Sequence, residues 1–232
     1  RALRGSTSLL SLWDDHEVHN DWEGSSVKPE RLSFARQAFN EHQPGTPDGP
    51  LWRKVSWGRT VDLFVIDARS ERNIDAGQYV SPEQLAWLIE SARSSTAVFK
   101  LVLNSVPIGS FDAPLFAFFA RDNWQSCPAQ RDELLTALEG TGAHFISGDF
   151  HFALVGRVSR SGPGATLTEF LVGPGANSPN PSPSYPTLPQ WDFASGHSNY
   201  ATFHCDPMTR VMTVRYHRGG GDVLFEATYP AP

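Results

Sequence analysis

The sequence predicts an α/β protein, a layered β-sandwich flanked by helices, from three observations. Short apolar runs alternate with helical patterns through most of the chain, as in proteins that stack helices on a sheet. The tail "YATFHCDPMTRVMTVRYHRGGGDVLFEATY" reads as two or three antiparallel strands. No internal repeat and no clear domain boundary divides the chain, so we expect one domain over residues 1–232, long enough to bury a sizeable core.

Three segments carry helix signals. The first, "VKPERLSFARQAFNEH", places Leu32, Ala35 and Phe39 on the side that we expect to be buried, with Phe34 as a further candidate for that side. The second, "SPEQLAWLIESAR", begins with Ser81 as the N-cap, followed by proline, and Gln84 stands where it would close a capping box. The third is "CPAQRDELLTALEG", which ends on a glycine.

Polar side chains follow apolar strand patterns at four places: "SLLSLW-DDHE", "DLFVI-DARSER", "KLVL-NSVP" and "HFIS-GDFH". We expect each apolar run, including the first at residues 7–13, to be a strand. Ligands of open α/β sheets bind at the carboxyl ends of the strands, so these four ends could converge on one point. Carboxylate, amide and imidazole groups together suit a hard or borderline metal ion.

Each motif also has a plainer interpretation. In an extended segment Asp149 and His151 would point to the same side as a ligand pair, but a surface turn with an incidental histidine is about equally expected. The run "DDHE" is a stronger candidate for a metal site, because four ionisable residues in a row are hard to place in a core. Its plainer explanation is a solvated acidic turn. Arg69 and Arg72 are natural oxyanion clamps, yet they could simply pair with neighbouring acids. Asn104 alone is typical of a turn after a strand.

Composition excludes some classes of function. A net charge of −6 and a pI near 5.7 argue against binding a nucleic-acid backbone. No apolar stretch approaches the roughly 20 residues that a membrane-spanning helix needs, and no signal peptide is visible. Cys127 and Cys205 could pair or stay free. The aromatic loop from Phe111 to Trp124 could cover a site as a lid, although an ordinary packed loop is the plainer expectation.

Taken together, the motifs resemble those of a known family. "LWDDHEVHNDW" resembles the "WDDHEV-N-W" signature of the PhoD-like alkaline phosphatases, within the calcineurin-like metallophosphoesterase superfamily. "DLFVIDARSERN", "FKLVLNSVP", "FISGDFHFA" and "LTEFLVGPGANSP" resemble further segments of that family, in the same order. The first motif is quite specific, and the others are individually weaker.

The resemblance implies roles for matching positions. Asp15 stands where the superfamily has a metal-ligating asparagine, and His16 falls on the histidine that assists the leaving-group oxygen. Glu17 or Asp14 would orient that imidazole. Asn104 lies on the strand that elsewhere carries a histidine ligand.

The same resemblance assigns Asp149 and His151 to the paired-ligand motif and Arg69, with Arg72, to phosphate binding. It implies two or more divalent or trivalent ions (calcium, iron, manganese or zinc) and attack by a metal-bound hydroxide on a small phosphate monoester or diester. It also suggests a secreted or periplasmic location.

One departure from the family pattern qualifies these expectations. The superfamily's first two metal motifs lie N-terminal to the "DDHE" position, and the residues before Ser8, "RALRGST", contain no plausible ligand. We therefore expect a fold incomplete at its N-terminus and a site that a missing segment or a second chain would complete. The alternative is a non-catalytic metal-binding or scaffold remnant of the same fold.

Overall fold

A seven-stranded mixed sheet forms the centre of the computed structural model, which describes residues 6–43, 49–111, 121–176, 178 and 189–232. The strand order is β1-β2-β3-β4-β6-β5-β7. Strands β2, β3, β4 and β6 run parallel, whereas β1 and β5 run antiparallel to their neighbours. The bounds are β1 (Arg53–Trp57), β2 (Val61–Val65), β3 (Phe99–Leu103), β4 (Ala143–Ser147), β5 (Ala153–Arg157), β6 (Thr168–Leu171) and β7 (Trp191–Ser195).

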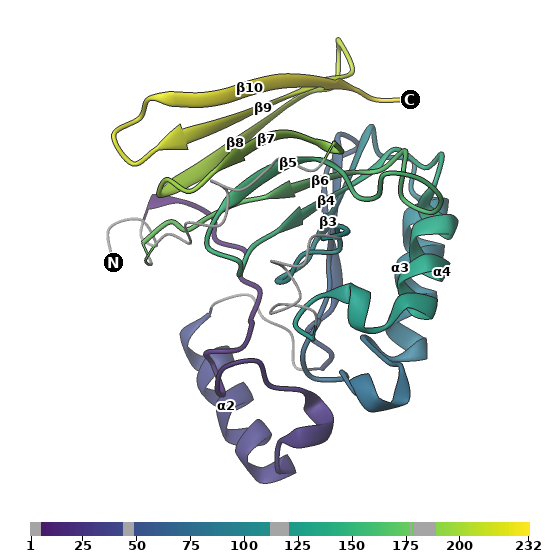
Figure 1. Ribbon diagram of the computed structural model, residues 1–232, viewed down its shortest axis with the longest axis vertical. Coiled ribbons are helices and arrows are strands. Elements are labelled where there is room, and N and C mark those ends of the chain that lie inside the picture. The colour runs from purple at the N-terminus through teal and green to yellow at the C-terminus, as the bar shows by residue number, and fades with distance from the viewer. Residues whose placement is uncertain (1–5, 44–48, 112–120, 177, 179–188) are drawn as a thin grey trace.

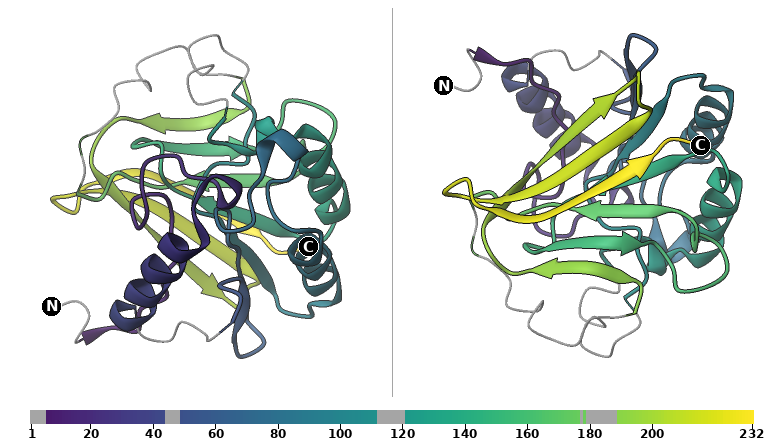
Figure 2. Two further views of the ribbon diagram at one scale, coloured as in Figure 1. Left: turned by 90° about the horizontal axis from the view of Figure 1, so that it is seen from below. Right: turned by 90° about the horizontal axis from the view of Figure 1, so that it is seen from above.

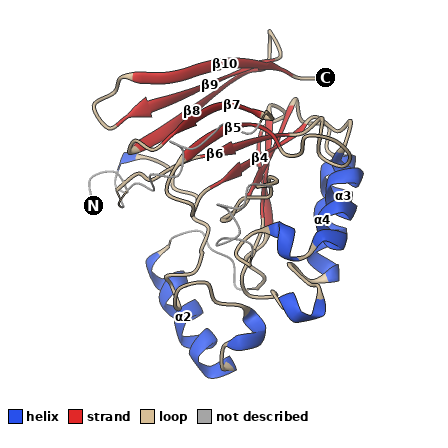
Figure 3. Cartoon of the chain, viewed as in Figure 1, coloured by secondary structure: helices blue, strands red, loops and turns tan. Residues whose placement is uncertain are grey.

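The central sheet is covered on both faces (Figure 1). A three-stranded antiparallel sheet of β8 (Asn199–Asp206), β9 (Val211–Arg218) and β10 (Val223–Pro230) lies over one face. Helices α3 (Pro82–Ser94) and α4 (Pro128–Leu138) lie over the other. The predicted α/β sandwich flanked by helices is therefore confirmed, and its layers separate clearly when the chain is coloured by secondary structure (Figure 3).

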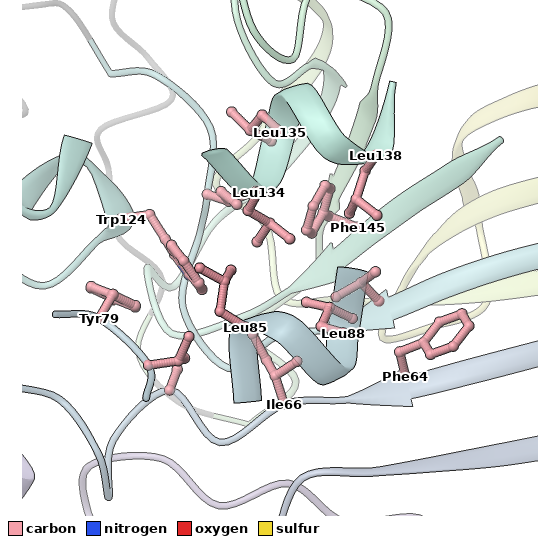
Figure 4. Packing of buried hydrophobic residues seen from close by; sticks show 14 of the residues in the cluster. Phe64, Ile66, Tyr79, Leu85, Leu88, Trp124, Leu134, Leu135, Leu138 and Phe145 are labelled. Carbon is pink, nitrogen blue, oxygen red and sulfur yellow. The ribbon is translucent and has the colours of Figure 1, made fainter. Parts of the chain in front are cut away.

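Two apolar cores hold these layers together. Between the helices and the sheet, Leu85 and Leu88 of α3 and Leu134 of α4 pack with Phe64 and Phe145 of the sheet (Figure 4). Between the two sheets, β9 contributes three side chains that are completely buried, and these pack against β3 and β6: Met212, Val214 and Tyr216 against Phe99, Leu101 and Phe170. Alternate residues of β9 face inward, because successive side chains of a strand point to opposite faces.

Helix α2 (Pro29–His42) lies with the N-terminal segment below these layers in Figure 1, and in front of them when the molecule is seen from below (Figure 2). The short 3-10 helices are η1 (Gly24–Ser26), η2 (Ile74–Ala76) and η4 (Trp124–Ser126). All three predicted α-helices are present, but the prediction that Phe34 is buried was wrong. Phe34 is 63% exposed and Phe39 is 6% exposed, because α2 contacts the rest of the chain along a narrow stripe.

The N-terminus of α3 bears out one prediction and corrects another. The Ser81 hydroxyl oxygen accepts a hydrogen bond from the backbone N–H of Gln84 at 3.1 Å, as an N-cap does. The side chain of Gln84 does not close a capping box. It is buried and bonds the backbone of Asp67, at 2.8 and 3.1 Å, and the carboxylate of Glu71, which itself accepts from the Ser81 N–H at 3.1 Å.

The strand predicted at residues 7–13 is absent, since these residues form no ladder. The backbone oxygen of Ser11 accepts from the Arg53 side chain at 3.1 Å instead of from a neighbouring strand. Trp13 anchors the segment, because its indole is 2% exposed and packs against Trp22 and Phe39. The apolar pattern there reflects the burial of the Trp13 side chain and not the presence of a strand.

Several other predictions concern the surface and the loops. Both Cys127 and Cys205 are free thiols, and Cys127 is buried. Phe111 and Trp124 pack into the protein at the two ends of the aromatic loop, whose residues 112–120 lie outside the described residues. Most of the proline-rich tract, residues 179–188, also lies outside them. Among the described residues, no helix combines the length and apolar character needed to cross a membrane.

Candidate metal centre

The carboxyl ends of β2, β3 and β4 lie at one edge of the central sheet, as parallel strands require. Backbone hydrogen bonds hold the segments after β3 and β4 side by side. The N–H of Asn104 donates to the oxygen of Ile146 at 2.9 Å, and the N–H of Gly148 donates to the oxygen of Ser105 at 3.1 Å. Asn104 and Asp149 are thus brought to the same edge, as the sequence predicted.

The N-terminal segment reaches this edge through contacts with the residues that follow β2. The indole N–H of Trp13 donates to a carboxylate oxygen of Asp67 at 3.0 Å. Gly24 lies against the chain after β2, where its N–H donates to the oxygen of Arg69 at 3.0 Å. A Cβ added at Gly24 would lie 1.8 Å from the oxygen of Ser70, so only glycine fits this contact.

Three carboxylates gather where these segments meet. Oxygen atoms of Asp14, Asp15 and Asp149 lie within 4.8 Å of one another. Asp15 is 4% exposed, and one of its carboxylate oxygens accepts from the N–H of Asp21 at 3.0 Å. The two aspartates of "DDHE" therefore belong to a partly buried acidic group, whereas His16 and Glu17 of the same run are exposed.

The pKa values of Asp14 and Asp149 are raised, chiefly by burial. Burial, then the charges of Asp14 and Asp122, raise the pKa of Asp149 from 3.8 to about 9. Burial also raises the pKa of Asp14, against the opposing effect of Arg69. A buried carboxylate is stable when it is protonated or when a cation neutralises it, so this group favours a positive ligand.

The segment that carries Asp149 is not extended, contrary to the prediction for "GDFH". Asp149 has a φ of 71° and His151 a φ of 57°, both in the left-handed region that few non-glycine residues adopt. The N–H of Phe150 donates to the oxygen of Gly148 at 2.9 Å and closes a tight turn. Phe150 itself is 2% exposed and packs against Phe111. The tight turn places the ring of Phe150 in the core, and Asp149 and His151 flank that ring in the sequence.

Asn104 provides an independent sign of a ligand. Its side chain is 2% exposed, and neither the amide oxygen nor the amide nitrogen has a hydrogen-bond partner. Buried polar atoms are almost always paired, because an unpaired one costs about 1–3 kcal/mol. An amide oxygen without a partner, on the loop beside Asp149, is a suitable ligand for a hard cation.

Arg69 and Arg72 are both buried, at 0% and 1% exposure, and both contact Asp122. Arg69 donates to the two Asp122 oxygens at 2.5 and 2.9 Å and from Nε to Asp14 at 2.7 Å. Arg72 donates to Asp122 at 2.5 Å and to the Tyr79 hydroxyl at 2.7 Å. Burial alone would lower the pKa of Arg69, but Asp14 and Asp122 raise it above its ordinary value. Both arginines therefore pair with acids, as in the plainer interpretation, but the acid that they share, Asp122, is distant in the sequence rather than a neighbour.

The histidines and Glu17 lie nearer the surface. The side chain of His16 is 78% exposed, and its Nε2 lies 3.9 Å from a carboxylate oxygen of Asp15. Glu17 is exposed, and its carboxylate caps the turn by accepting a hydrogen bond from the backbone N–H of Asp14 at 3.0 Å. His151 is partly buried and follows Asp149 by two residues, but it is not among the side chains whose ligand atoms lie within 4.8 Å of one another.

Sequence reasoning missed two residues of this network, Asp122 and Tyr79. Asp122 lies at the end of the aromatic loop, and it belongs to no motif that would mark it as a functional residue. Its pKa is held below its ordinary value: burial raises it, and the two arginines more than offset that effect. Tyr79 is completely buried, with the guanidinium of Arg72 4.2 Å from its ring centre, and no local pattern marks it as a partner of an arginine.

The donor set fits a hard cation. Three carboxylates and an unpaired amide offer oxygen ligands of the kind that calcium, magnesium or manganese prefer. Among the described residues, this is the one group of at least three acids, histidines or cysteines close enough together to share an ion.

Comparison with known proteins agrees with this geometry. The profile of the family described as PhoD-like phosphatase matches residues 1–202. The chain belongs to the PhoD-like phosphatase family. The predicted family resemblance is therefore confirmed.

Individual relatives are considerably longer than this chain. Alkaline phosphatase D of Bacillus subtilis (strain 168) is 26% identical in an alignment 187 residues long, which covers 65% of this chain and 32% of that protein. A solved structure of PhoD superposes with a TM-score of 0.75 at 19% identity, over 95% of this chain and 52% of that one. Purple acid phosphatase PPD1 from yellow lupin (Lupinus luteus) seeds superposes with a TM-score of 0.62 at 13% identity, over 85% of this chain and 35% of that one. This chain thus spans about a third to a half of the proteins that it matches.

Proposed function

We propose that this chain contributes to a metal-dependent phosphoric ester hydrolase, acting on small phosphate monoesters or diesters. The observation that carries the proposal is the partly buried group of Asp14, Asp15 and Asp149, together with the unpaired amide of Asn104 on the neighbouring loop. Family membership supports the same chemistry. A location outside the cytoplasm stays a prediction of the family resemblance.

In this proposal Asp15, Asp149 and Asn104 hold an ion, and His151 lies close enough in the chain to assist them. A bound ion would supply positive charge for the phosphate oxygens and lower the pKa of a water molecule toward about 7. Asp14 shares one oxygen with Arg69 and has the second oxygen available for the ion. The two-ion prediction stays open, since the described residues form one such group.

His16 is the residue proposed to act on the leaving-group oxygen. Its imidazole is exposed at the rim of the acidic group, 3.9 Å from Asp15, where a substrate could reach it. Imidazole is suited to this step because its ordinary pKa lies near neutrality. Arg69 and Arg72 support the site by holding Asp14 and Asp122, and they contact phosphate only if Asp122 leaves them.

Burial of the arginines favours a second candidate, a non-catalytic metal-binding domain. Arg69 is 0% exposed, and all three of its nitrogen atoms donate to carboxylates rather than toward an open surface. A scaffold of this kind would bind a cation without hydrolysing an ester.

The test is hydrolysis of p-nitrophenyl phosphate and of bis(p-nitrophenyl) phosphate with added Ca²⁺, Fe³⁺, Mn²⁺ or Zn²⁺. We expect hydrolysis of at least one ester that requires metal and falls on the order of 100-fold in Asp149→Asn and His16→Ala. His19→Ala is the matched control, since His19 is exposed on the same loop and its imidazole Nδ1 hydrogen-bonds the backbone oxygen of the neighbouring Asn20. Metal binding without hydrolysis would favour the scaffold, and hydrolysis unaffected by Asp149→Asn would contradict both candidates.

A further inference from the structure

Glu169 on β6 is a completely buried acid that the proposed chemistry does not use. Its carboxylate accepts three hydrogen bonds: from the N–H of Ile108 at 2.9 Å, the N–H of Gly109 at 2.8 Å and the hydroxyl of Ser147 at 2.5 Å. Burying a carboxylate is costly unless donors of this kind compensate it. The three donors that surround Glu169 therefore indicate what this buried acid does in the fold.

Those partners belong to the two loops that carry the candidate metal ligands. Ile108 and Gly109 lie on the loop that leaves β3 through Asn104. Ser147 is the last residue of β4 and stands two positions before Asp149. One carboxylate consequently joins both ligand-bearing loops from inside the protein, behind the edge of the sheet where the acidic group lies.

Arg131 of α4 fixes the same loop from the other side. Its Nε donates to the oxygen of Ile108 at 2.8 Å, and its Nη2 donates to the hydroxyls of Ser110 and Ser159 at 2.9 and 3.0 Å. Burial raises the pKa of Glu169 above its ordinary value, and its three hydrogen bonds and the charge of Arg131 oppose that effect. The loop backbone at Ile108 is thus held between a buried acid and a buried base.

Gly109 shows how little room this arrangement leaves. A Cβ added there would lie 2.6 Å from a carboxylate oxygen of Glu169 and 2.8 Å from the ring of Trp191. Glycine lets the backbone approach the carboxylate closely enough for the 2.8 Å bond. Displacing Glu169 would therefore displace the loop.

We propose that Glu169 is a positioning residue of the metal centre, setting the distance between Asn104 and Asp149. The inference rests on the proposed function, because it assumes that these two side chains share an ion. Ligands that are not held by supporting hydrogen bonds lose affinity, typically 10–100-fold. The left-handed backbone at Asp149 makes such support necessary, since a strained conformation persists only where its surroundings impose it.

Glu169→Gln tests the inference, because the amide keeps the size of the side chain but replaces one acceptor oxygen by a donor. We expect Mn²⁺ to bind about 10–100-fold more weakly in titrations followed by the electron paramagnetic resonance of free Mn²⁺. Ser147→Ala removes the bond nearest Asp149 and should weaken Mn²⁺ binding in the same direction. That second variant keeps the test available if Glu169→Gln does not fold.

Asp62→Asn is the matched control for a merely structural role. Asp62 is another buried acid of the same sheet, bonded to the hydroxyls of Ser56 and Ser95, both at 2.6 Å. It lies near the start of β2, away from the edge that carries the aspartates. We expect Asp62→Asn to lower the unfolding temperature without changing Mn²⁺ affinity.

Each outcome is informative. Unchanged Mn²⁺ affinity in Glu169→Gln and Ser147→Ala, in a chain that binds Mn²⁺ before substitution, would overturn the positioning role and leave the proposed metal site standing. Equal weakening in Asp62→Asn would also overturn it, since any loss of stability would then suffice. Failure of the unsubstituted chain to bind Mn²⁺ would overturn the proposed metal site and this inference with it.

Discussion

Arg69 and Asp122 face each other in a two-point contact, with Nη1 to Oδ1 at 2.5 Å and Nη2 to Oδ2 at 2.9 Å. The pair is buried and lies directly beside Asp14, which takes the remaining Nε donor of Arg69. Asp122 therefore occupies the two guanidinium N–H donors of Arg69 that an oxyanion would need. It also supplies the negative charge that makes burial of two neighbouring guanidinium groups tolerable.

Asp122→Asn should destabilise the protein because it removes a charge on which two buried arginines depend. Breaking a buried ion pair from one side costs about 3–5 kcal/mol, and we expect a loss at the low end, since asparagine keeps part of the hydrogen bonding. Urea denaturation measures this change in the free energy of unfolding. Glu226→Gln, which breaks the exposed pair of Glu226 with Arg215, should produce no measurable change. Equal effects of the two substitutions would contradict the importance of burial.

Asp149→Asn should stabilise the metal-free protein at alkaline pH. The pKa of Asp149 is about 9 in the folded protein and 3.8 ordinarily, so unfolding releases a proton between these values and stability falls as pH rises. Asparagine cannot titrate, so in EDTA at pH 8 the variant should be more stable by on the order of 2 kcal/mol. Thermal unfolding of both proteins from pH 5 to pH 9 would measure this difference in stability. A variant whose stability falls with pH as steeply as the unsubstituted chain would contradict the assignment.

Local patterns explain which parts of the site the sequence predicted. An apolar run followed by a polar residue is a local signal, and it located Asn104 and Asp149 correctly at the ends of β3 and β4. The same signal was wrong at residues 7–13, because whether an apolar run forms a strand depends on a neighbour with free backbone groups.

Tertiary contacts explain what could not be predicted. Asp122 is 53 positions from Arg69 and 50 from Arg72, so nothing near it in the sequence marks it as their partner. The turned backbone at Asp149 likewise follows from burial of Phe150, which a two-residue spacing does not reveal. Glu169 reads as part of an ordinary strand until its three donors are seen.

Asn104→Leu should abolish stabilisation by metal while leaving the metal-free protein intact. Leucine removes two buried polar atoms that have no partner, so the free energy of unfolding in EDTA should stay unchanged or rise by about 1 kcal/mol. In the unsubstituted chain, Mn²⁺ at 100 times its Kd should add about 2.7 kcal/mol, and the variant should gain much less. Thermal unfolding with and without Mn²⁺ measures both quantities.

Asn199→Leu is the control for that substitution. Asn199 is equally buried, but its amide donates to the oxygens of Gly173 and His197 and accepts from the Gly173 N–H. Losing these bonds should cost about 2–3 kcal/mol in EDTA. Similar losses in both variants would show that the Asn104 amide is paired after all.

His144 should make the fold sensitive to acid. Its ring lies between Phe170 and Tyr229, 5.8 Å from each ring centre, and its Nδ1 is buried without a partner. Burial lowers the pKa of His144 from 6.5 to about 4, so below pH 6.5 the unfolded chain takes up a proton that the folded protein refuses. Stability is therefore lost as pH falls from about 6.5 to 4.

His144→Phe removes this titration and keeps an aromatic ring between the two sheets. Between pH 7 and pH 5 the unsubstituted chain should lose roughly 1–2 kcal/mol more of its free energy of unfolding than the variant does. Urea denaturation at both pH values measures the difference. His204→Phe is the matched control, since His204 is exposed on β8 and should leave the full acid sensitivity in place. Parallel losses in the unsubstituted chain and His144→Phe would mean that His144 is protonated in the folded protein, which its apolar surroundings argue against.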